Sequence, residues 1–66
     1  MYPKATYMVV LARGNDERHY YPEVRDTTEP MNKIRAVNAA MIDWREEFEH
    51  NSTNGIRVVS ITRKEG

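Results

Sequence analysis

The chain has 66 residues, 39% of them apolar and 30% charged, with ten Lys and Arg balancing ten Asp and Glu and no cysteine. This length fits one domain, 1–66, and the zero formal charge disfavours a general nucleic-acid binder. The missing cysteines exclude disulfides and thiolate metal sites, and no apolar run reaches the roughly 18 residues that span a bilayer. We therefore expect a cytoplasmic domain outside the membrane, with no cofactor.

The first half of the chain predicts two strands joined by a turn. Residues 6–12 are rich in β-branched and aromatic side chains, which favour a strand. Residues 13–18 contain Gly14, Asn15 and Asp16, which are typical of a turn. Residues 19–25 alternate in polarity and predict a second strand. Because Pro22 has no N–H to donate, this strand is expected at an edge of the sheet.

The second half predicts a helix followed by a strand. A helix start is indicated by Thr27, Thr28 or Glu29 at the N-cap and Pro30 in the first turn. An apolar stripe with helical spacing then predicts the face that packs on the sheet, namely Ile34, Val37, Met41, Trp44 and Phe48. The helix is expected to end near residues 50–51, and residues 56–63 predict the last strand.

The predicted fold class is therefore α+β, with strand–strand–helix–strand (ββαβ) order and one helix packed on one face of a three-stranded antiparallel sheet. A right-handed crossover returns the last strand parallel to the second. If it pairs beside the first strand, the sheet is antiparallel throughout and the spatial order is second–first–third (2-1-3), which is the order we expect. The most apolar strand, 6–12, then takes the centre. A last strand outside the second is the alternative, which Pro22 disfavours.

Apolar side chains occur on both faces of two predicted strands. On the first strand, one face carries Tyr7, Val9 and Leu11 and the other Met8, Val10 and Ala12. On the last strand, we expect Ile56 and Val58 on one face and Val59 and Ile61 on the other. One helix covers one face only. The second face is expected to be covered by a bulge or the N-terminal arm, to face water, or to bind a second copy (a homodimer) or a foreign protein.

The helix carries a candidate partner surface away from its apolar stripe. At about 100° per residue, Met31 and Ile42 fall within a charged face. Asp43, Glu46 and Glu49 crowd the last turns, where the helix dipole favours cations instead. An apolar centre with an acidic rim is typical of a contact with a basic protein surface. A solvated helix face is the alternative interpretation.

A second candidate surface would stack nucleic-acid bases. Arg18, His19, Tyr21 and Arg25, with Tyr20, combine aromatic rings and cations in the second strand. The balanced charge makes nucleic acid the secondary hypothesis. The two histidines, His19 and His50, stand in no nucleophile, phosphate-loop or metal-ligand pattern, so we expect a binding protein and not an enzyme.

The layout of the chain resembles that of small phage-encoded inhibitors of host machinery. It is carried by the strand at residues 7–11, the His19-Tyr20-Tyr21 run, the helix start at 26–29 and the strand at 55–59. The short RNA polymerase inhibitor of T7-like phages and several anti-CRISPR proteins share this order and size. The resemblance implies a stoichiometric inhibitor that occludes a surface of a host protein complex in the host cytoplasm. It transfers no site residue by motif.

Overall fold

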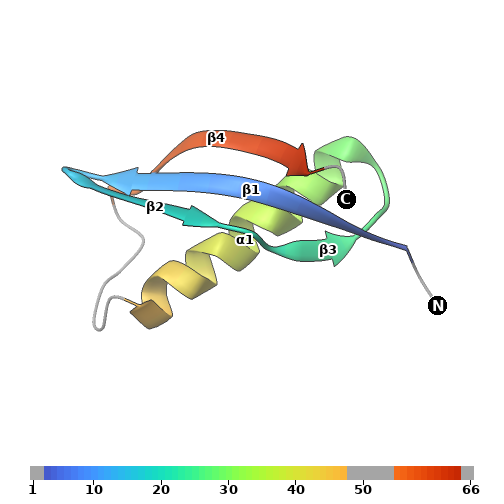
Figure 1. Ribbon diagram of the computed structural model, residues 1–66, viewed down its shortest axis with the longest axis horizontal. Helices are drawn as coiled ribbons and strands as arrows, with labels where there is room; N and C mark the ends of the chain where they lie inside the picture. The colour runs from blue at the N-terminus through green and yellow to red at the C-terminus, as the bar shows by residue number, and fades with distance from the viewer. Residues whose placement is uncertain (1–2, 48–54, 65–66) are drawn as a thin grey trace.

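The computed structural model describes residues 3–47 and 55–64, which form an α+β domain with one helix against an antiparallel sheet (Figure 1). Its elements in chain order are β1 (Lys4–Arg13), β2 (Asp16–Tyr20), β3 (Glu23–Arg25), α1 (Glu29–Glu47) and β4 (Arg57–Lys64). The predicted fold class is confirmed.

The long strand β1 is the centre of the sheet. Its second half pairs with β2, from Val9↔Tyr20 to Arg13↔Asp16, and its first half pairs with β3. On its other edge β1 pairs with β4, from Thr6↔Lys64 to Ala12↔Arg57, and all three pairings are antiparallel. The second and last segments of the chain therefore lie on opposite sides of the first, which is the predicted order.

Two local features of the sheet differ from the sequence prediction. The turn 13–18 is shorter than expected, because Gly14 adopts a left-handed φ of 60° and only residues 14–15 connect β1 to β2. The predicted strand 19–25 is divided at residues 21–22, because Pro22 has no N–H to donate to a ladder. Its two parts, β2 and β3, share the edge position predicted for it.

The helix covers the sheet face that carries Tyr7, Val9 and Leu11. All three side chains are fully buried, and they belong to one core cluster with Val24 of β3. From α1 the cluster receives Ala36, Ala40 and Trp44, which follow one another at intervals of four residues. In the core, the large side chains of β1 thus pack against the buried side of α1, where Ala36 and Ala40 are small.

The predicted helix stripe is partly corrected. Trp44 is fully buried as expected, and Val37 and Met41 are half-buried at the margin of the core. Ile34 was expected in the core, but it is 55% exposed. The reason is that Tyr7 and Leu11 already fill the space above the sheet, so that the helix approaches through Ala36 and Ala40 instead. Phe48 and the predicted helix end at 50–51 lie outside the described residues.

A bulge in β4 changes which of its side chains face the helix. Ser60 pairs with Val10 and Val58 pairs with Leu11, so Val59 is an extra residue between two consecutive positions of β1. Ile61, opposite Val9, and Val58, opposite Leu11, therefore share the helix side. The expectation that they lie on opposite faces was wrong for this reason.

The sheet face turned away from the helix is more polar than β1 alone suggested. Val10 and Ala12 of β1 point to this face, yet they are only 4% and 3% exposed. Their cross-strand neighbours include His19, Ser60 and Arg57, whose longer or polar side chains stand beside them. Neighbouring strands thus shield the small apolar side chains of the central strand.

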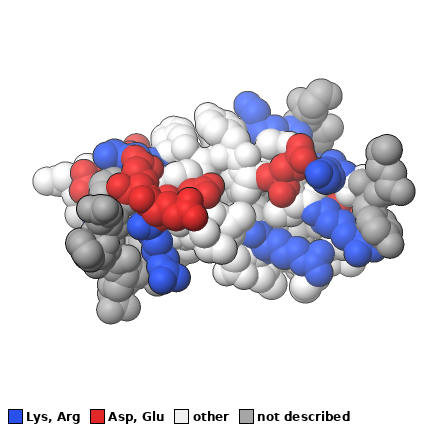
Figure 2. All heavy atoms as spheres, turned by 90° about the horizontal axis from the view of Figure 1, so that it is seen from below, with Lys and Arg blue, Asp and Glu red and all other residues white. Residues whose placement is uncertain are grey.

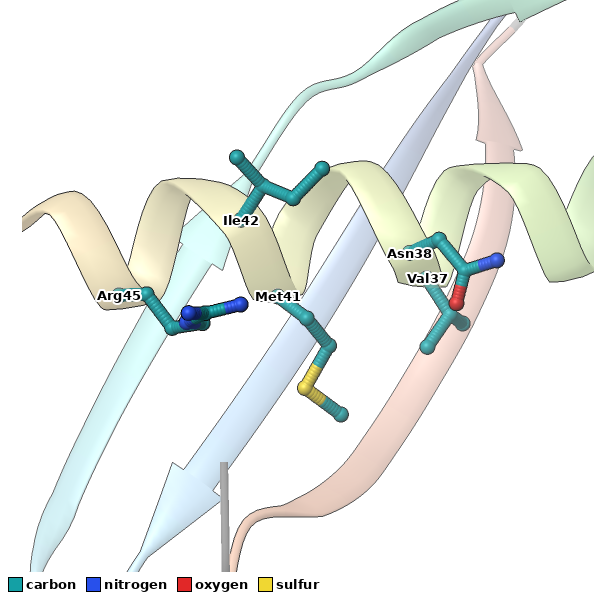
Figure 3. A pocket seen from close by; sticks show the side chains of 5 residues that line it. All are labelled: Val37, Asn38, Met41, Ile42 and Arg45. Atoms are coloured by element: carbon teal, nitrogen blue, oxygen red, sulfur yellow. The ribbon is translucent and has the colours of Figure 1, made fainter. Parts of the chain in front are cut away.

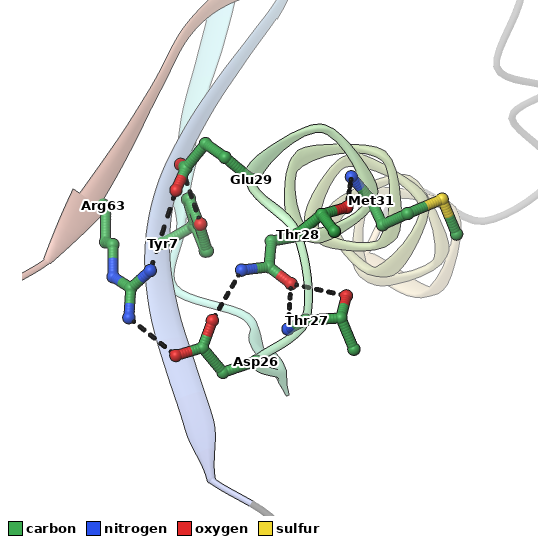
Figure 4. A network of polar contacts seen from close by, with 8 residues as sticks. Tyr7, Asp26, Thr27, Thr28, Glu29, Met31 and Arg63 are labelled. Atoms are coloured by element: carbon green, nitrogen blue, oxygen red, sulfur yellow. Dashed lines mark hydrogen bonds and ion pairs between the residues drawn. The ribbon is translucent and has the colours of Figure 1, made fainter.

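The start of α1 is fixed by a buried polar network (Figure 4). The fully buried Asn32 donates from Nδ2 to Asp26 Oδ1 at 2.9 Å, and its Oδ1 accepts the Thr27 N–H at 2.9 Å. Thr28 is the N-cap, because its Oγ1 accepts the Met31 N–H. A threonine at this position was among the predicted caps.

The same network ties the helix start to both β1 and β4. The hydroxyl of Tyr7 donates to Glu29 Oε1 at 2.9 Å. Arg63 of β4 lies 2.9 Å from Asp26 Oδ2 and 3.6 Å from Glu29 Oε2. The amide of Asn32, together with Arg63, holds the pKa of Asp26 below its ordinary value. Hydrogen bonds and ion pairs therefore hold the first turn of α1 to both β1 and β4.

Candidate protein-binding surface

The side of α1 opposite the sheet exposes three large apolar side chains. Ile34 is 55% exposed, Ile42 is 54% exposed and Met31 is 41% exposed. At about 100° per residue, they share one side of the helix with Asn38 and Arg45. We call these five residues, Met31, Ile34, Asn38, Ile42 and Arg45, the outer helix face.

An open groove runs along one flank of the outer helix face (Figure 3). It is lined by Val37, Asn38, Met41, Ile42 and Arg45. Figure 3 shows Val37 and Met41 pointing to the side of α1 on which β4 begins, whereas Ile42 points to the opposite side. Val37 and Met41 are half-buried and pack against the core, so the apolar lining of the groove is continuous with the core.

Acidic side chains border the outer helix face at its C-terminal end. Asp43 and Glu46 are exposed in the last turns of α1, beside Ile42. Figure 2 shows acidic groups gathered at the end of the molecule where α1 ends and β2 begins, and basic groups mostly toward the opposite end. Among the predicted site residues, Glu46 lies on the Ile42 side of α1, Asp43 lies about 100° further round the helix toward Tyr20 of β2, Met31 lies about three helical turns away, and Glu49 falls outside the described residues.

One acidic side chain of this region is engaged with the sheet. Glu47 accepts the Tyr20 hydroxyl at 2.8 Å and the Arg18 Nε–H at 3.1 Å. Burial and then this hydrogen bond raise the pKa of Tyr20 to about 12. The Tyr20 hydroxyl and Arg18 hold the pKa of Glu47 below its ordinary value. Glu47 thus connects α1 with β2, whereas Asp43 and Glu46 face solvent.

The residues of the predicted stacking surface are divided between the two sides of the sheet. Arg18 and Tyr20 turn to the helix side, where both contact Glu47. His19 and Arg25 alternate with them and with the buried Val24, so they face the other side. There Lys64 places its Nζ 5.9 Å from the centre of the Tyr21 ring. His19, Tyr21 and Arg25 remain on one face, without Arg18 and Tyr20.

Two further kinds of site are not found in the described part of the chain. Residues 3–47 and 55–64 contain no group of three or more His, Asp or Glu side chains placed to hold a metal ion. Within the same residues, no helix combines the length and the apolar character needed to cross a bilayer.

Sequence reasoning missed Ile34 as a surface residue and did not single out Val58 and Val59 as a surface pair. Val58 and Val59 of β4 are 41% and 49% exposed. A signal for Ile34 was present, because Ala36, Ala40 and Trp44 repeat every fourth residue and define an alternative buried line. The bulge that redirects Val58 has no such signal, since no glycine marks it.

Comparison of the chain with protein-family models, with curated proteins and with solved structures gives no match.

Proposed function

We propose that this protein is a small intracellular protein-binding module that occludes a surface of its partner with the outer helix face. The observation that carries the proposal is the distribution of side chains on α1. The helix turns Ala36 and Ala40 to the sheet and exposes Ile34 and Ile42. The sheet admits only small side chains at the buried positions, but folding stability alone gives no reason for isoleucine, instead of alanine, at the exposed ones.

The energetic argument uses known magnitudes. Burying an isoleucine side chain stabilises a fold by about 1.5–3 kcal/mol relative to leaving it exposed. Alanine is also the better helix former at exposed positions. The two exposed isoleucines therefore contribute little to the stability of the fold. A binding partner that covers them would gain this burial energy for the complex. This argument supports a contact surface at Ile34 and Ile42, with Met31 at its N-terminal end.

The acidic side chains at the C-terminal end of this surface favour a basic partner, although the face itself also contains the cation Arg45. Asp43 and Glu46 lie near a helix C-terminus, where the backbone dipole opposes negative charge. Opposite charge on a partner offsets this unfavourable position and speeds encounter. An apolar centre with a charged rim is also the usual anatomy of a protein interface.

The resemblance in layout to phage-encoded inhibitors supports a particular class of partner. In this form of the proposal the chain is an inhibitor of a host complex, either RNA polymerase or a CRISPR effector. Both complexes carry basic surfaces that bind nucleic acid, and an acidic-rimmed module would compete for such a surface.

Binding to purified complexes tests the proposal. The chain is immobilised and exposed separately to bacterial RNA polymerase and to a CRISPR effector complex. We expect one of them to bind the wild type, and the double variant Ile34→Ala, Ile42→Ala to lose at least about tenfold in affinity, since each buried anchor is worth more than about 1 kcal/mol. Tyr21→Ala removes a comparably exposed side chain outside α1 and serves as the matched control.

The same experiment separates folding from function. The double variant should unfold at the same or a slightly higher temperature, because alanine has the higher helix propensity. Equal binding by the wild type and the double variant would exclude the outer helix face. Binding of generic oligonucleotides that weakens steeply with salt and is lost in Tyr21→Ala would assign the function to the opposite sheet face instead.

A further inference from the structure

The two edges of the sheet are built differently. One edge consists of β2 and β3, strands of five and three residues separated at residues 21–22. The other edge is β4, a continuous strand of eight residues without proline. In Figure 1, β4 runs along the margin of the sheet, and among the described strands it pairs with β1 alone.

Edge strands carry unpaired backbone N–H and C=O groups that attract another strand. Natural proteins block such edges with short strands, proline and charged side chains. The β2–β3 edge has all three, since Pro22 interrupts it and β2 begins with Asp16, Glu17 and Arg18. The β4 edge has an uncharged centre of five residues, 58–62, and a single bulge at Val59. Within residues 3–47 and 55–64, the β2–β3 edge is therefore protected along its length, whereas β4 has only its bulge and its terminal charges against pairing.

The charges at the two ends of β4 indicate which kind of strand fits it. Arg57 begins the strand, and Arg63 and Lys64 end it. Arg63 is engaged with Asp26 and Glu29, whereas Arg57 and Lys64 are exposed at the two ends, Lys64 with its Nζ 5.9 Å from the centre of the Tyr21 ring. In an end-to-end antiparallel pairing of two β4 strands, each Arg57 would lie opposite a Lys64. Like charges directly opposite one another destabilise a strand pair, so this arrangement disfavours a second copy of the chain.

We propose that β4 accepts an extended segment of a partner protein as an additional strand, with an uncharged β-branched centre and an acidic residue at each end. The main-chain groups of β4 supply hydrogen bonds, and Arg57 and Lys64 supply charge complementarity. Val58 and Val59, 41% and 49% exposed, supply apolar contact. This surface is separate from the outer helix face, so the proposal stands without the function proposed above.

A synthetic strand tests the proposal directly. The probe is a blocked octapeptide of sequence Glu-Val-Thr-Val-Thr-Val-Thr-Glu, titrated into the isotopically labelled chain while backbone amide resonances are followed. We expect shifts concentrated in β4. A peptide with lysine at both ends should bind at least about tenfold more weakly at low salt, because its charges oppose Arg57 and Lys64. A version N-methylated at every residue should lose binding, because it lacks all main-chain donors.

Two matched substitutions locate the site. Val59→Asp places a carboxylate in the uncharged centre of β4 and should weaken binding of the acidic peptide about tenfold. Ile34→Asp makes a similar change at an exposed apolar residue of α1 and should leave the affinity unchanged. If Val59→Asp does not fold, Lys64→Glu serves instead and should shift preference toward the lysine-ended peptide.

Three results would overturn the proposal. The first is amide shifts confined to α1 or to the opposite sheet face. The second is equal affinity for the acid-ended and lysine-ended peptides. The third is a dimer in sedimentation that Val59→Asp dissociates and that the peptide does not displace, which would assign the β4 edge to a second copy of the chain. The double variant Ile34→Ala, Ile42→Ala tests only the outer helix face. If it loses partner binding, the three results for β4 are still interpreted in the same way.

Discussion

Trp44 is the largest side chain that the described fold buries completely, and it closes one end of the core. It follows Ala36 and Ala40 on the buried line of α1, and the Arg13 guanidinium carbon lies 5.4 Å from the centre of its ring. The two alanines let the helix approach the sheet closely, and the indole then fills the wider space near the helix end. On the buried side of α1, the small side chains of Ala36 and Ala40 are thus followed by the largest fully buried side chain, that of Trp44.

Replacing Trp44 with alanine should remove most of the stability of the domain. The change leaves a cavity in the core and should lower the free energy of unfolding by about 3–5 kcal/mol. Small domains have total stabilities of only about 5–15 kcal/mol. Urea unfolding followed by circular dichroism measures the effect. Ile34→Ala is the control and should change the free energy by no more than about 0.5 kcal/mol. A Trp44→Ala variant as stable as this control would contradict the observed burial.

Residue burial could be predicted from the sequence only in part. The burial of Trp44 was predicted correctly because its size and helical spacing agree. Ile34 was placed wrongly because the apolar stripe gave weight to large side chains, whereas the space left by Tyr7 and Leu11 admits small ones. Whether a helix packs through isoleucine or alanine depends on the opposing strand, which the helix sequence alone does not reveal.

At the scale of elements, Asn32 connects the β3–α1 loop to the body of the helix. Its side chain satisfies the Thr27 N–H and donates to Asp26, and the residue is fully buried. Asn32→Ala would remove two part-buried hydrogen bonds, at a cost of about 1–3 kcal/mol. Thermal unfolding of the variant measures the loss. Asn38→Ala, at an exposed position of the same helix, should have almost no effect, and equal losses in both variants would argue against the network.

Two of the strands could be predicted from the local amino-acid composition. Residues 6–12 and 56–63 were predicted as strands and form the greater part of β1 and β4. Pro22 correctly indicated an edge position, but the division of its strand into β2 and β3 was not predicted. The alternation of polar and apolar residues continues through residues 21–22, so the sequence pattern did not indicate that the strand is interrupted there. The bulge at Val59 was missed for a similar reason, since it depends on the pairing with β1.

For the molecule as a whole, two carboxylates link the helix to the strands and make stability depend on pH. Hydrogen bonds from Asn32 and Arg63 lower the pKa of Asp26, and those from Tyr20 and Arg18 lower the pKa of Glu47. A depressed folded-state pKa contributes stability that is present above the unfolded values of about 3.9 and 4.3 and is lost as pH falls through the folded values.

The melting temperature should therefore decline as pH is lowered from about 5 toward about 2. The double variant Asp26→Asn, Glu47→Gln should melt lower than the wild type at neutral pH and show a shallower acid decline. Glu46→Gln alters an exposed carboxylate and leaves the contacts of Asp26 and Glu47 in place, so it should retain the wild-type slope. Parallel declines in wild type and double variant would mean that other groups control acid stability.

The candidate site was predictable in outline and not in detail. Met31 and Ile42 were identified from their position off the apolar stripe, and Asp43 and Glu46 from their negative charge in the last helical turns; the structure places all four at exposed positions of α1. Ile34 joined them only once the packing of the helix was known. The edge position of β4 follows from the predicted order second–first–third, whereas its bulge at Val59 could not be predicted, because the bulge depends on the pairing with β1.

The central place of β1 also determines the order in which the fold can assemble. The β1–β2 hairpin joins neighbours in the sequence, whereas the β1–β4 pairing brings Thr6 to Lys64 and so closes most of the chain into a loop. Loop closure loses more chain entropy as the loop lengthens, and pairings between distant segments slow folding. We therefore expect the hairpin to form early and the pairing of β4 with β1 to be the late, rate-limiting event. Until β4 arrives, the most apolar strand of the protein is itself an unpaired edge.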